Sequence, residues 1–265
     1  MLRPRVIPCL LVHQGGLVKT RGFADAKYVG DPINAVRIFN EKEADELMVL
    51  DIDATASGIE PDFNLIAKLA AECRMPLCYG GGVTTAEQAA RIVDMGVEKV
   101  AVSAAAIAKP GLVKAMAEAV GRQSVVVVLD VRKRTGLFAR GYELSSHNGK
   151  LTHKVDPLIF ARQIQDAGAG EIVVNSIDRD GFMQGYDLEL AAEFKQILKV
   201  PMTFLGGAGS LDHIRELFSR LGVVGGAAGS LFVFKGRYRA VLISYPTPEQ
   251  KVQICRDSLE VSDPV

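Results

Sequence analysis

The chain has no tryptophan, only four cysteines in 265 residues and no excess of either charge, since 31 basic side chains balance 31 acidic ones. A net charge of zero gives no electrostatic basis for binding nucleic acid or an acidic membrane surface. No apolar stretch approaches the roughly 20 residues of a membrane span. The short run Val6–Val12 contains Pro8, which does not fit a signal peptide. We therefore predict a cytoplasmic protein without membrane or nucleic-acid partners.

The cysteines and histidines show no spacing typical of a metal site. Cys9 and Cys78 lie in apolar runs, which predicts buried free thiols and a reducing compartment. The sequence thus predicts no metal and no cofactor. Each histidine is expected to have an ordinary role; the four are His13, His147, His153 and His213.

Hydrophobic residues make up 48% of the chain, enough for a sizeable core. Eight short apolar runs alternate with amphipathic segments, as in parallel strands that are buried on both faces. Asp31–Pro32 and Thr84–Gln88 are typical helix starts. We predict an α/β fold, a single (β/α)8 TIM barrel over 1–265 with half-barrels at about 1–120 and 121–245. The expected strands are 5–12, 46–52, 76–80, 98–103, 124–131, 171–176, 201–206 and 222–228.

The chain also contains an internal repeat. Residues 46–53 and 171–178 each read as a buried strand that ends in an acid, and 76–82 and 201–207 each read as a buried strand that ends in a Gly-Gly turn. Both pairs are 125 residues apart. Two half-chains of one design suggest a site with two similar ends, such as one that holds a substrate with two phosphates.

Two strand-to-helix connections are long, glycine-rich and basic, at 13–30 and 132–154, and the second has the pattern of a small hairpin. In a barrel both lie at the carboxyl ends of the strands, where catalytic groups gather. Lys19 in the first connection is suited to reach a substrate phosphate. The alternative is a solvated loop lysine.

Glycine turns follow three of the expected strands, at Gly80–Gly82, Gly206–Gly209 and Gly229–Ser230. Glycine lets the backbone approach an anion, and the N-terminus of the next helix donates N–H groups to it. Glycines can also serve only to permit tight turns. Because two turns occupy matching positions of the repeat, phosphate binding is the favoured interpretation.

Acidic side chains follow several strands. Asp130 ends the fifth strand, and an acid there can act as a general acid or base. Asp51 is a second candidate, whereas Asp53 and Asp178 are as well explained as turn or cap residues. The repeat pairs Asp130 with Leu11, so one half of the barrel presents a carboxylate and the other an isobutyl group.

Four charged residues stand at the opposite ends of their strands, at the predicted N-terminal face of the barrel. Two cations and two anions there can form a closed ring of ion pairs. Such a ring plugs the base of an isolated barrel, or acts as a gate in a barrel that receives a molecule from below. The four residues are Arg5, Glu46, Lys99 and Glu171.

With these residues in view, the chain resembles the cyclase subunit of imidazole glycerol phosphate synthase over about 5–235. That family is a (β/α)8 barrel whose glutaminase partner docks on the N-terminal face, and ammonia crosses the barrel to a substrate with two phosphates. The motifs that carry the resemblance are Arg5–Leu10, Val18-Lys19, Gly30–Pro32, Asp45–Ile52, Gly80–Gly82, Glu98–Val100, Val126–Asp130, Ser176–Gly181 and Gly206–Gly209.

The resemblance implies roles for these positions. The four-residue ring is the ammonia gate, and Asp130 is catalytic together with Lys19 and Asp51 as candidates. The glutaminase faces Glu98 and Gln123. The two phosphate sites comprise Gly82, Ser103 and Ala104 at one end and Asp180, Gly181, Gly207, Gly229 and Ser230 at the other.

The chain departs from the family pattern at the second catalytic acid, which is Leu11 here. Ser103-Ala104 replaces an Asn-Thr pair, Asn175 replaces a Thr and Leu205 replaces a Ser. A kept gate with a lost acid resembles a paralogous branch associated with surface-polysaccharide (O-antigen) biosynthesis. In that branch a glutaminase supplies ammonia for amidination of an acetamido sugar.

Three hypotheses follow. The first is an ammonia-channelling synthase subunit of a glutamine amidotransferase that acts on a phosphorylated or nucleotide-linked sugar in lipopolysaccharide biosynthesis. The second is an authentic cyclase subunit of histidine biosynthesis, in which another group such as Asp51 replaces the acid absent at Leu11. The third is a non-catalytic scaffold that conducts ammonia to another protein.

Overall fold

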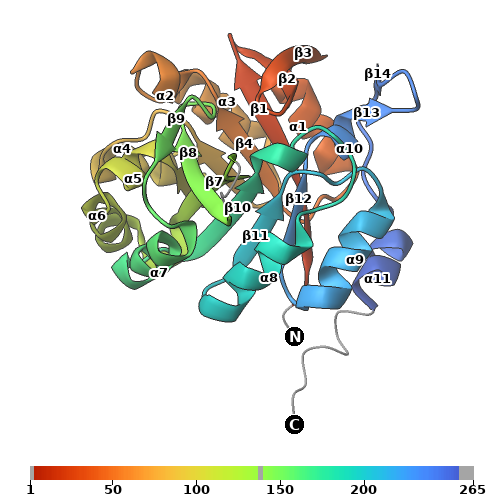
Figure 1. Cartoon of the computed structure of the whole chain (residues 1–265). Coiled ribbons are helices and arrows are strands. Elements are labelled where there is room, and N and C mark those ends of the chain that lie inside the picture. Colours follow the sequence, from red (N-terminus) through yellow and green to blue (C-terminus); the bar gives the residue numbers. More distant parts are fainter. Residues whose placement is uncertain (1–2, 137–139, 257–265) are drawn as a thin grey trace.

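The computed structural model describes residues 3–136 and 140–256, which form a closed barrel of strands surrounded by helices (Figure 1). Eight parallel strands follow the order β10–β11–β12–β1–β4–β5–β6–β7, and β10 pairs with β7 to close the barrel. The predicted (β/α)8 barrel is confirmed. The parallel strands are β1 (Arg5–His13), β4 (Leu47–Asp51), β5 (Leu77–Gly80), β6 (Lys99–Val102), β7 (Val125–Lys133), β10 (Glu171–Ser176), β11 (Met202–Leu205) and β12 (Gly225–Ala228).

Every expected strand overlaps an observed one, with small differences at the ends. The last strand differs most, since it begins at Gly225 rather than at residue 222. The ends of the predicted 1–265 domain, and residues 137–139, lie outside the part of the chain that is described.

Helices follow the strands and cover the outside of the barrel (Figure 1). Two begin as the sequence predicts: Asp31 caps α1 by accepting a bond from Asn34 N at 2.8 Å, and Thr85 forms a capping box with Gln88 at the start of α4. The α-helices are α1 (Pro32–Glu41), α2 (Ala54–Ser57), α3 (Phe63–Glu72), α4 (Ala86–Asp94), α5 (Ala104–Ala108), α6 (Gly111–Val120), α7 (Pro157–Ala167), α8 (Leu188–Ile197), α9 (Leu211–Leu221), α10 (Ser230–Val233) and α11 (Pro248–Cys255). Short 3-10 helices are η1 (Arg122–Ser124) and η2 (Ile177–Arg179).

Two hairpins rise from the carboxyl ends of the barrel strands (Figure 1). β2 (Gly16–Arg21) and β3 (Ala24–Gly30) extend β1, and β8 (Tyr142–Ser146) and β9 (Leu151–His153) extend β7. The hairpin within 132–154 was expected, but the one within 13–30 was not, because its basic residues hide the strand pattern. A small third hairpin joins β13 (Phe234–Lys235) to β14 (Ala240–Val241).

The core has two apolar layers. The larger layer lies between strands and helices, and the smaller one fills the barrel itself. Cys9 and Cys78 belong to the inner layer as buried free thiols, as predicted. Within the described residues, no helix is long and apolar enough to cross a membrane. The other fully inner residues are Ile7, Met48, Ala101, Val126, Val128, Val173, Leu205 and Ala227.

Candidate active site and the ion-pair ring at its base

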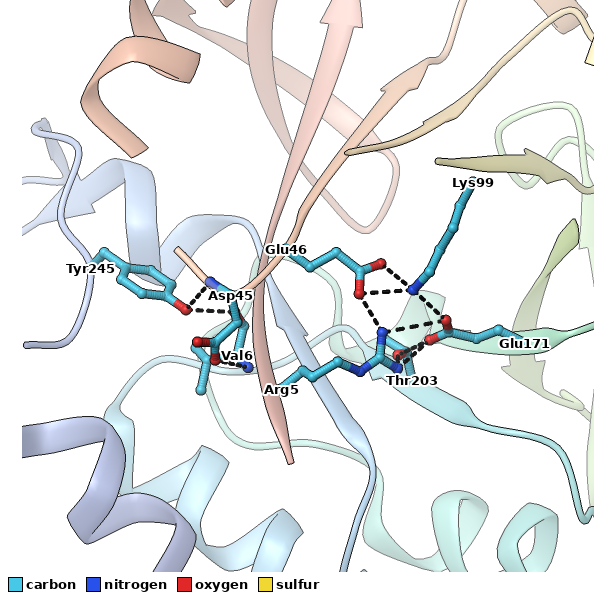
Figure 2. Close-up of polar contacts among 8 residues, drawn as sticks. All are labelled: Arg5, Val6, Asp45, Glu46, Lys99, Glu171, Thr203 and Tyr245. Carbon is cyan, nitrogen blue, oxygen red and sulfur yellow. Dashed lines mark hydrogen bonds and ion pairs between the residues drawn. The ribbon is translucent and has the colours of Figure 1, made fainter. Parts of the chain in front are cut away.

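The four charged residues predicted at the N-terminal face meet in one closed ring (Figure 2). The Arg5 guanidinium donates to Glu46 and, at 2.7 Å, to Glu171. The Lys99 ammonium donates to both oxygens of Glu46 at 2.8 and 2.9 Å and to Glu171 at 2.9 Å. Each cation therefore touches both anions, and each anion both cations.

The ring has a fifth polar member that the sequence did not single out. Thr203 on β11 donates to Glu171 at 2.6 Å and accepts from Arg5 at 3.4 Å. Burial alone raises the pKa of Glu171, but the two cations outweigh it and lower that pKa to about 2. Glu171 is thus held in its ionised form, and both carboxylates of the ring are buried.

A second polar cluster lies beside the ring, at the starts of β1 and β4 (Figure 2). The Tyr245 hydroxyl donates to Val6 O at 2.7 Å and accepts from Asp45 N at 3.0 Å. The Asp45 carboxylate accepts from Val6 N at 3.1 Å and from Lys251 on α11 at 2.9 Å. The Tyr245 and Asp45 side chains thus hydrogen-bond to the backbone just before the first residue of β4. They hold in place the residues that adjoin Arg5 and Glu46.

The predicted partner-facing residues lie near the ring. Glu98 directly precedes Lys99, and Gln123 lies in η1 before β7. Both side chains are exposed. Between the ring and the opposite end of the barrel the interior is filled by the inner apolar layer, which includes small residues such as Ala101 and Ala227.

A cavity opens at the carboxyl ends of the strands, opposite the ring. Its empty space, counted to the open mouth, is about 1090 Å³. Asp130, Asn175 and Leu11 line it, and its floor includes members of the inner apolar layer such as Ala101 and Leu205.

Asp130 is the central acid of the cavity. Asn175 on the neighbouring strand donates to it at 2.8 Å. Burial raises the pKa of Asp130 to about 6, although the bond from Asn175 works in the other direction. A carboxyl group in this range can give or take a proton near neutral pH.

Lys19 is not a solvated loop lysine. Its side chain is buried and forms an ion pair with Asp180 at 2.7 Å, and Thr20 donates to the same carboxylate at 3.0 Å. Both Lys19 and Asp180 line the cavity. The β2–β3 hairpin is thereby joined to the turn after β10, where Gly22 N donates to Asp180 O at 2.9 Å.

The other acids hold turns. Asp51 lines the cavity, but it accepts from Asp53 N at 2.9 Å and Ala54 N at 3.1 Å, and burial raises its pKa. The Asp53 carboxylate accepts from Gln14 N at 2.8 Å, and Asp178 accepts from Lys133 N at 2.7 Å. The structural interpretation of Asp53 and Asp178 therefore holds.

The two predicted phosphate sites are not equivalent. Gly82, Ser103 and Ala104 all line the cavity, and among the described residues the buried Ser103 hydroxyl finds no hydrogen-bond partner. From the second site only Asp180 and Gly229 reach the cavity.

The remaining members of the second site face the protein's own backbone. Gly207 O accepts from Gly185 N at 2.8 Å, and a Cβ on Gly181 would meet the Thr20 backbone. Gly181 has φ of +73°, so glycine is required there for conformation and for space. Within the described chain the Ser230 hydroxyl is buried and unpartnered.

Sequence reasoning missed the groups that cover the cavity. Phe23 from the first hairpin and His147 and Asn148 from the second line it. The histidine had been expected to be ordinary. Asn175 was noted only as a departure, although the 125-residue offset pairs it with Leu50 and so marks it as inward-facing.

Comparison with known proteins agrees with this architecture. Residues 5–239 match the family described as histidine biosynthesis protein. The chain is 57% identical over 251 residues, covering 95% of it and 96% of the relative, to a Vibrio vulnificus protein named "Putative imidazole glycerol phosphate synthase subunit hisF3". It is 52% identical over 246 residues, 93% and 97% of the two chains, to the Pseudomonas aeruginosa protein named "Putative imidazole glycerol phosphate synthase subunit hisF2".

The chain belongs to the cyclase-subunit family of imidazole glycerol phosphate synthase. A Clostridium botulinum family member named "Imidazole glycerol phosphate synthase subunit HisF" is 37% identical over 235 residues, covering 89% of this chain and 92% of that one. Within the family, this chain is therefore nearer to the two relatives with numbered subunit names.

Proposed function

We propose that this chain is the ammonia-using synthase subunit of a glutamine amidotransferase complex. A glutaminase docks at the face that carries Glu98 and Gln123, ammonia passes the ion-pair ring and the apolar interior, and it reacts in the cavity beside Asp130. The observation that carries the proposal is the ring of two cations and two anions at one end of an apolar barrel interior that opens into the cavity.

The proposed substrate is a phosphorylated or nucleotide-linked sugar, and the proposed reaction is amidination of an acetamido sugar for lipopolysaccharide. This proposal is supported by the difference between the β7–β10 side of the cavity and the β1–β4 side. Asp130 pairs with Asn175 across β7 and β10, whereas Leu11 pairs with Leu50 across β1 and β4. General acid–base assistance is worth roughly 10²–10⁴-fold, so a wall without an acid disfavours the histidine-pathway reaction.

The alternative is an authentic cyclase of histidine biosynthesis, which the family membership favours. In that case Asp51 is the remaining acid on the β4 side, but its carboxylate is engaged by two backbone N–H groups. A non-catalytic ammonia conductor is the third possibility; the raised pKa of Asp130, caused by burial, argues against it because a mere conduit needs no such group.

The docking face is tested with the glutaminase of the same organism. Wild-type protein should bind it and accelerate glutamine hydrolysis, and Glu98→Arg should lose both effects. Glu87→Arg is the matched control, since Glu87 is exposed at the start of α4, at the opposite end of the barrel. Equal binding by wild type and Glu98→Arg contradicts the proposed face.

The reaction is tested with the histidine-pathway substrate and ammonium chloride. We expect slow turnover in the wild type and no gain in Leu11→Asp if the natural substrate is a different sugar. A large gain in Leu11→Asp favours the histidine-pathway alternative, and turnover at a normal rate by the wild type contradicts the proposal outright.

A further inference from the structure

The β8–β9 hairpin brings a histidine into the cavity. Ser146 and Leu151 form the last pair of the hairpin, so a four-residue turn begins at His147. His147 and Asn148 both have left-handed backbone, with φ of 52° and 57°. His and Asn adopt this conformation more readily than most non-glycine residues, and here it shapes the turn of the hairpin.

The tip of this hairpin is tied across the mouth of the cavity. The Asn148 side chain donates to Ile52 O at 2.9 Å, on the turn that follows β4. Lys150 N closes the turn by donating to His147 O at 3.2 Å. The turn that carries His147 is thus tied to the opposite half of the barrel through its neighbour Asn148.

The same histidine begins a chain of polar groups. His147 Nδ1 lies 2.9 Å from Ser146 Oγ, and Ser146 Oγ lies 2.8 Å from His153 Nε2. Ser146 is buried, whereas His153 is partly exposed. A hydroxyl has one proton, so Ser146 donates to one imidazole and accepts from the other. The three residues connect the cavity to the outer side of the hairpin.

The cavity lacks a second acid–base group at the position related to Asp130 by the repeat. Asp130 pairs with Asn175 across β7 and β10, whereas the corresponding pair across β1 and β4 is Leu11 and Leu50. Resting on the proposed function, we propose that His147 is the second acid–base residue of the cavity and that Ser146 and His153 carry its proton to the surface.

The proton balance is simple. When the nitrogen of ammonia bonds to an electrophilic carbon, it becomes positively charged, and His147 Nε2 takes one of its protons. The proton on Nδ1 passes to Ser146 Oγ as the hydroxyl proton moves to His153 Nε2. His147 is neutral again, and His153 carries the positive charge. Asp130 in its protonated form gives its proton to the oxygen of the attacked carbon, which becomes a hydroxyl group. One proton leaves the nitrogen and one reaches the oxygen, so this addition step is balanced and needs no oxidant or reductant.

Charged groups from several elements share the cavity with the imidazole. Asp51 comes from β4 and Asp130 from β7, while Lys19 of β2 and Asp180 are paired with each other.

The first test is nitrogen NMR of the imidazoles in the full chain. We expect His147 and His153 to titrate as a coupled pair, and Ser146→Ala to uncouple them. Ribose 5-phosphate, as the sugar-phosphate probe, should shift His147, whereas His13, which pairs with Asp53 outside the cavity, should not move. Independent titration of His147 and His153 in the wild type overturns the relay.

The second test uses the complex with the glutaminase and the histidine-pathway substrate with ammonium chloride. His147→Asn keeps a residue that tolerates left-handed backbone. The variant should have a kcat about 100-fold lower with KM unchanged, and added imidazole should restore part of the activity. The control His13→Asn should keep the wild-type kcat. An unchanged kcat overturns the inference. If the wild type shows no turnover of this substrate, the proposed reaction is not tested by this assay. The NMR titration then decides whether His147, Ser146 and His153 form the relay.

Discussion

Removal of one cation from the ring is the most direct test of its electrostatics. Lys99→Met leaves Glu46 and Glu171 with Arg5 alone, a net charge of −1 in a site where the two carboxylate side chains are only 3% and 6% exposed. Breaking a buried ion pair costs about 3–5 kcal/mol, and the partial exposure of Lys99 places the expected loss near the lower end, about 3 kcal/mol. Glu46→Gln added to Lys99→Met restores neutrality and should recover about 2 kcal/mol.

The pH dependence of the same variant has a defined sign. Burial by itself raises the pKa of Glu171, but Arg5 and Lys99 lower it from 4.5 to about 2. A depressed folded pKa contributes stability above pH 4.5 that is lost as the pH falls toward 2. The gap between wild type and Lys99→Met should therefore narrow over that range.

The assay is urea unfolding followed by circular dichroism at pH 7 and in steps down to pH 3. Lys114→Met is the control, because the Lys114–Glu118 pair is exposed and its loss should cost under about 1 kcal/mol. Equal losses for Lys99→Met and Lys114→Met, or no recovery in the double variant, would refute a closed buried ring in solution.

Three further predictions concern single side chains. Asp130 has a folded pKa of about 6, raised by burial above the ordinary 3.8, so the fold favours its protonated form below pH 4 and loses that contribution as pH rises through 6. In urea unfolding at pH 7.5, Asp130→Asn should thus have a free energy of unfolding up to about 3 kcal/mol above that of the wild type, and the two should converge at pH 4. Lys19→Met leaves Asp180 buried without its cation, and urea unfolding at pH 7 should show a loss of about 3 kcal/mol, which falls if Asp180→Asn is added. Tyr245→Phe removes two hydrogen bonds at the strand starts and should cost about 1–2 kcal/mol in urea unfolding, more than Tyr186→Phe, which removes one.

Local chain chemistry was enough to predict the barrel. Runs of Val, Ile and Leu without polar alternation mark strands covered on both faces, and cap residues such as Asp31 and Thr85 mark where helices begin. The four ring residues could be predicted because each stands at or near the start of a strand. In a closed barrel the strand starts meet at one end, so position in the strand determines position in space.

The cavity was less predictable because hairpins build much of its wall. Phe23, His147 and Asn148 reach it from the turns of hairpins that extend beyond the barrel, and the apolar strand pattern that marks the barrel does not mark these turns. Lys19 was assigned to the site, but its buried partner Asp180 lies 161 residues away and had been assigned to a phosphate. Likewise the Tyr245–Asp45 contact joins residues 200 apart.

The repeat explains why Asp130 has its unusual environment. Pairing across β1 and β4 sets Leu11 beside Leu50, and pairing across β7 and β10 sets Asp130 beside Asn175. At the 125-residue offset Leu50 corresponds to Asn175, so one half-barrel has a hydrogen-bonded polar pair where the other has two isobutyl groups. The apolar pair stands where the other half-barrel has its acid, and all four side chains line one cavity.

The same asymmetry extends to the glycine turns. Gly80–Gly82 remain open to the cavity, whereas Gly207 is bonded to the turn at Gly185 and does not reach it. A two-fold design therefore ends in two unlike rims: the glycine turn after β5 lines the cavity, whereas the turn after β11 is bonded to the turn at Gly185. We expect a ligand with a single phosphate at the first turn to suit this arrangement better than a symmetric bisphosphate, because the turn at Gly80–Gly82 and the Ser103 hydroxyl, which has no partner within the described chain, both line the cavity.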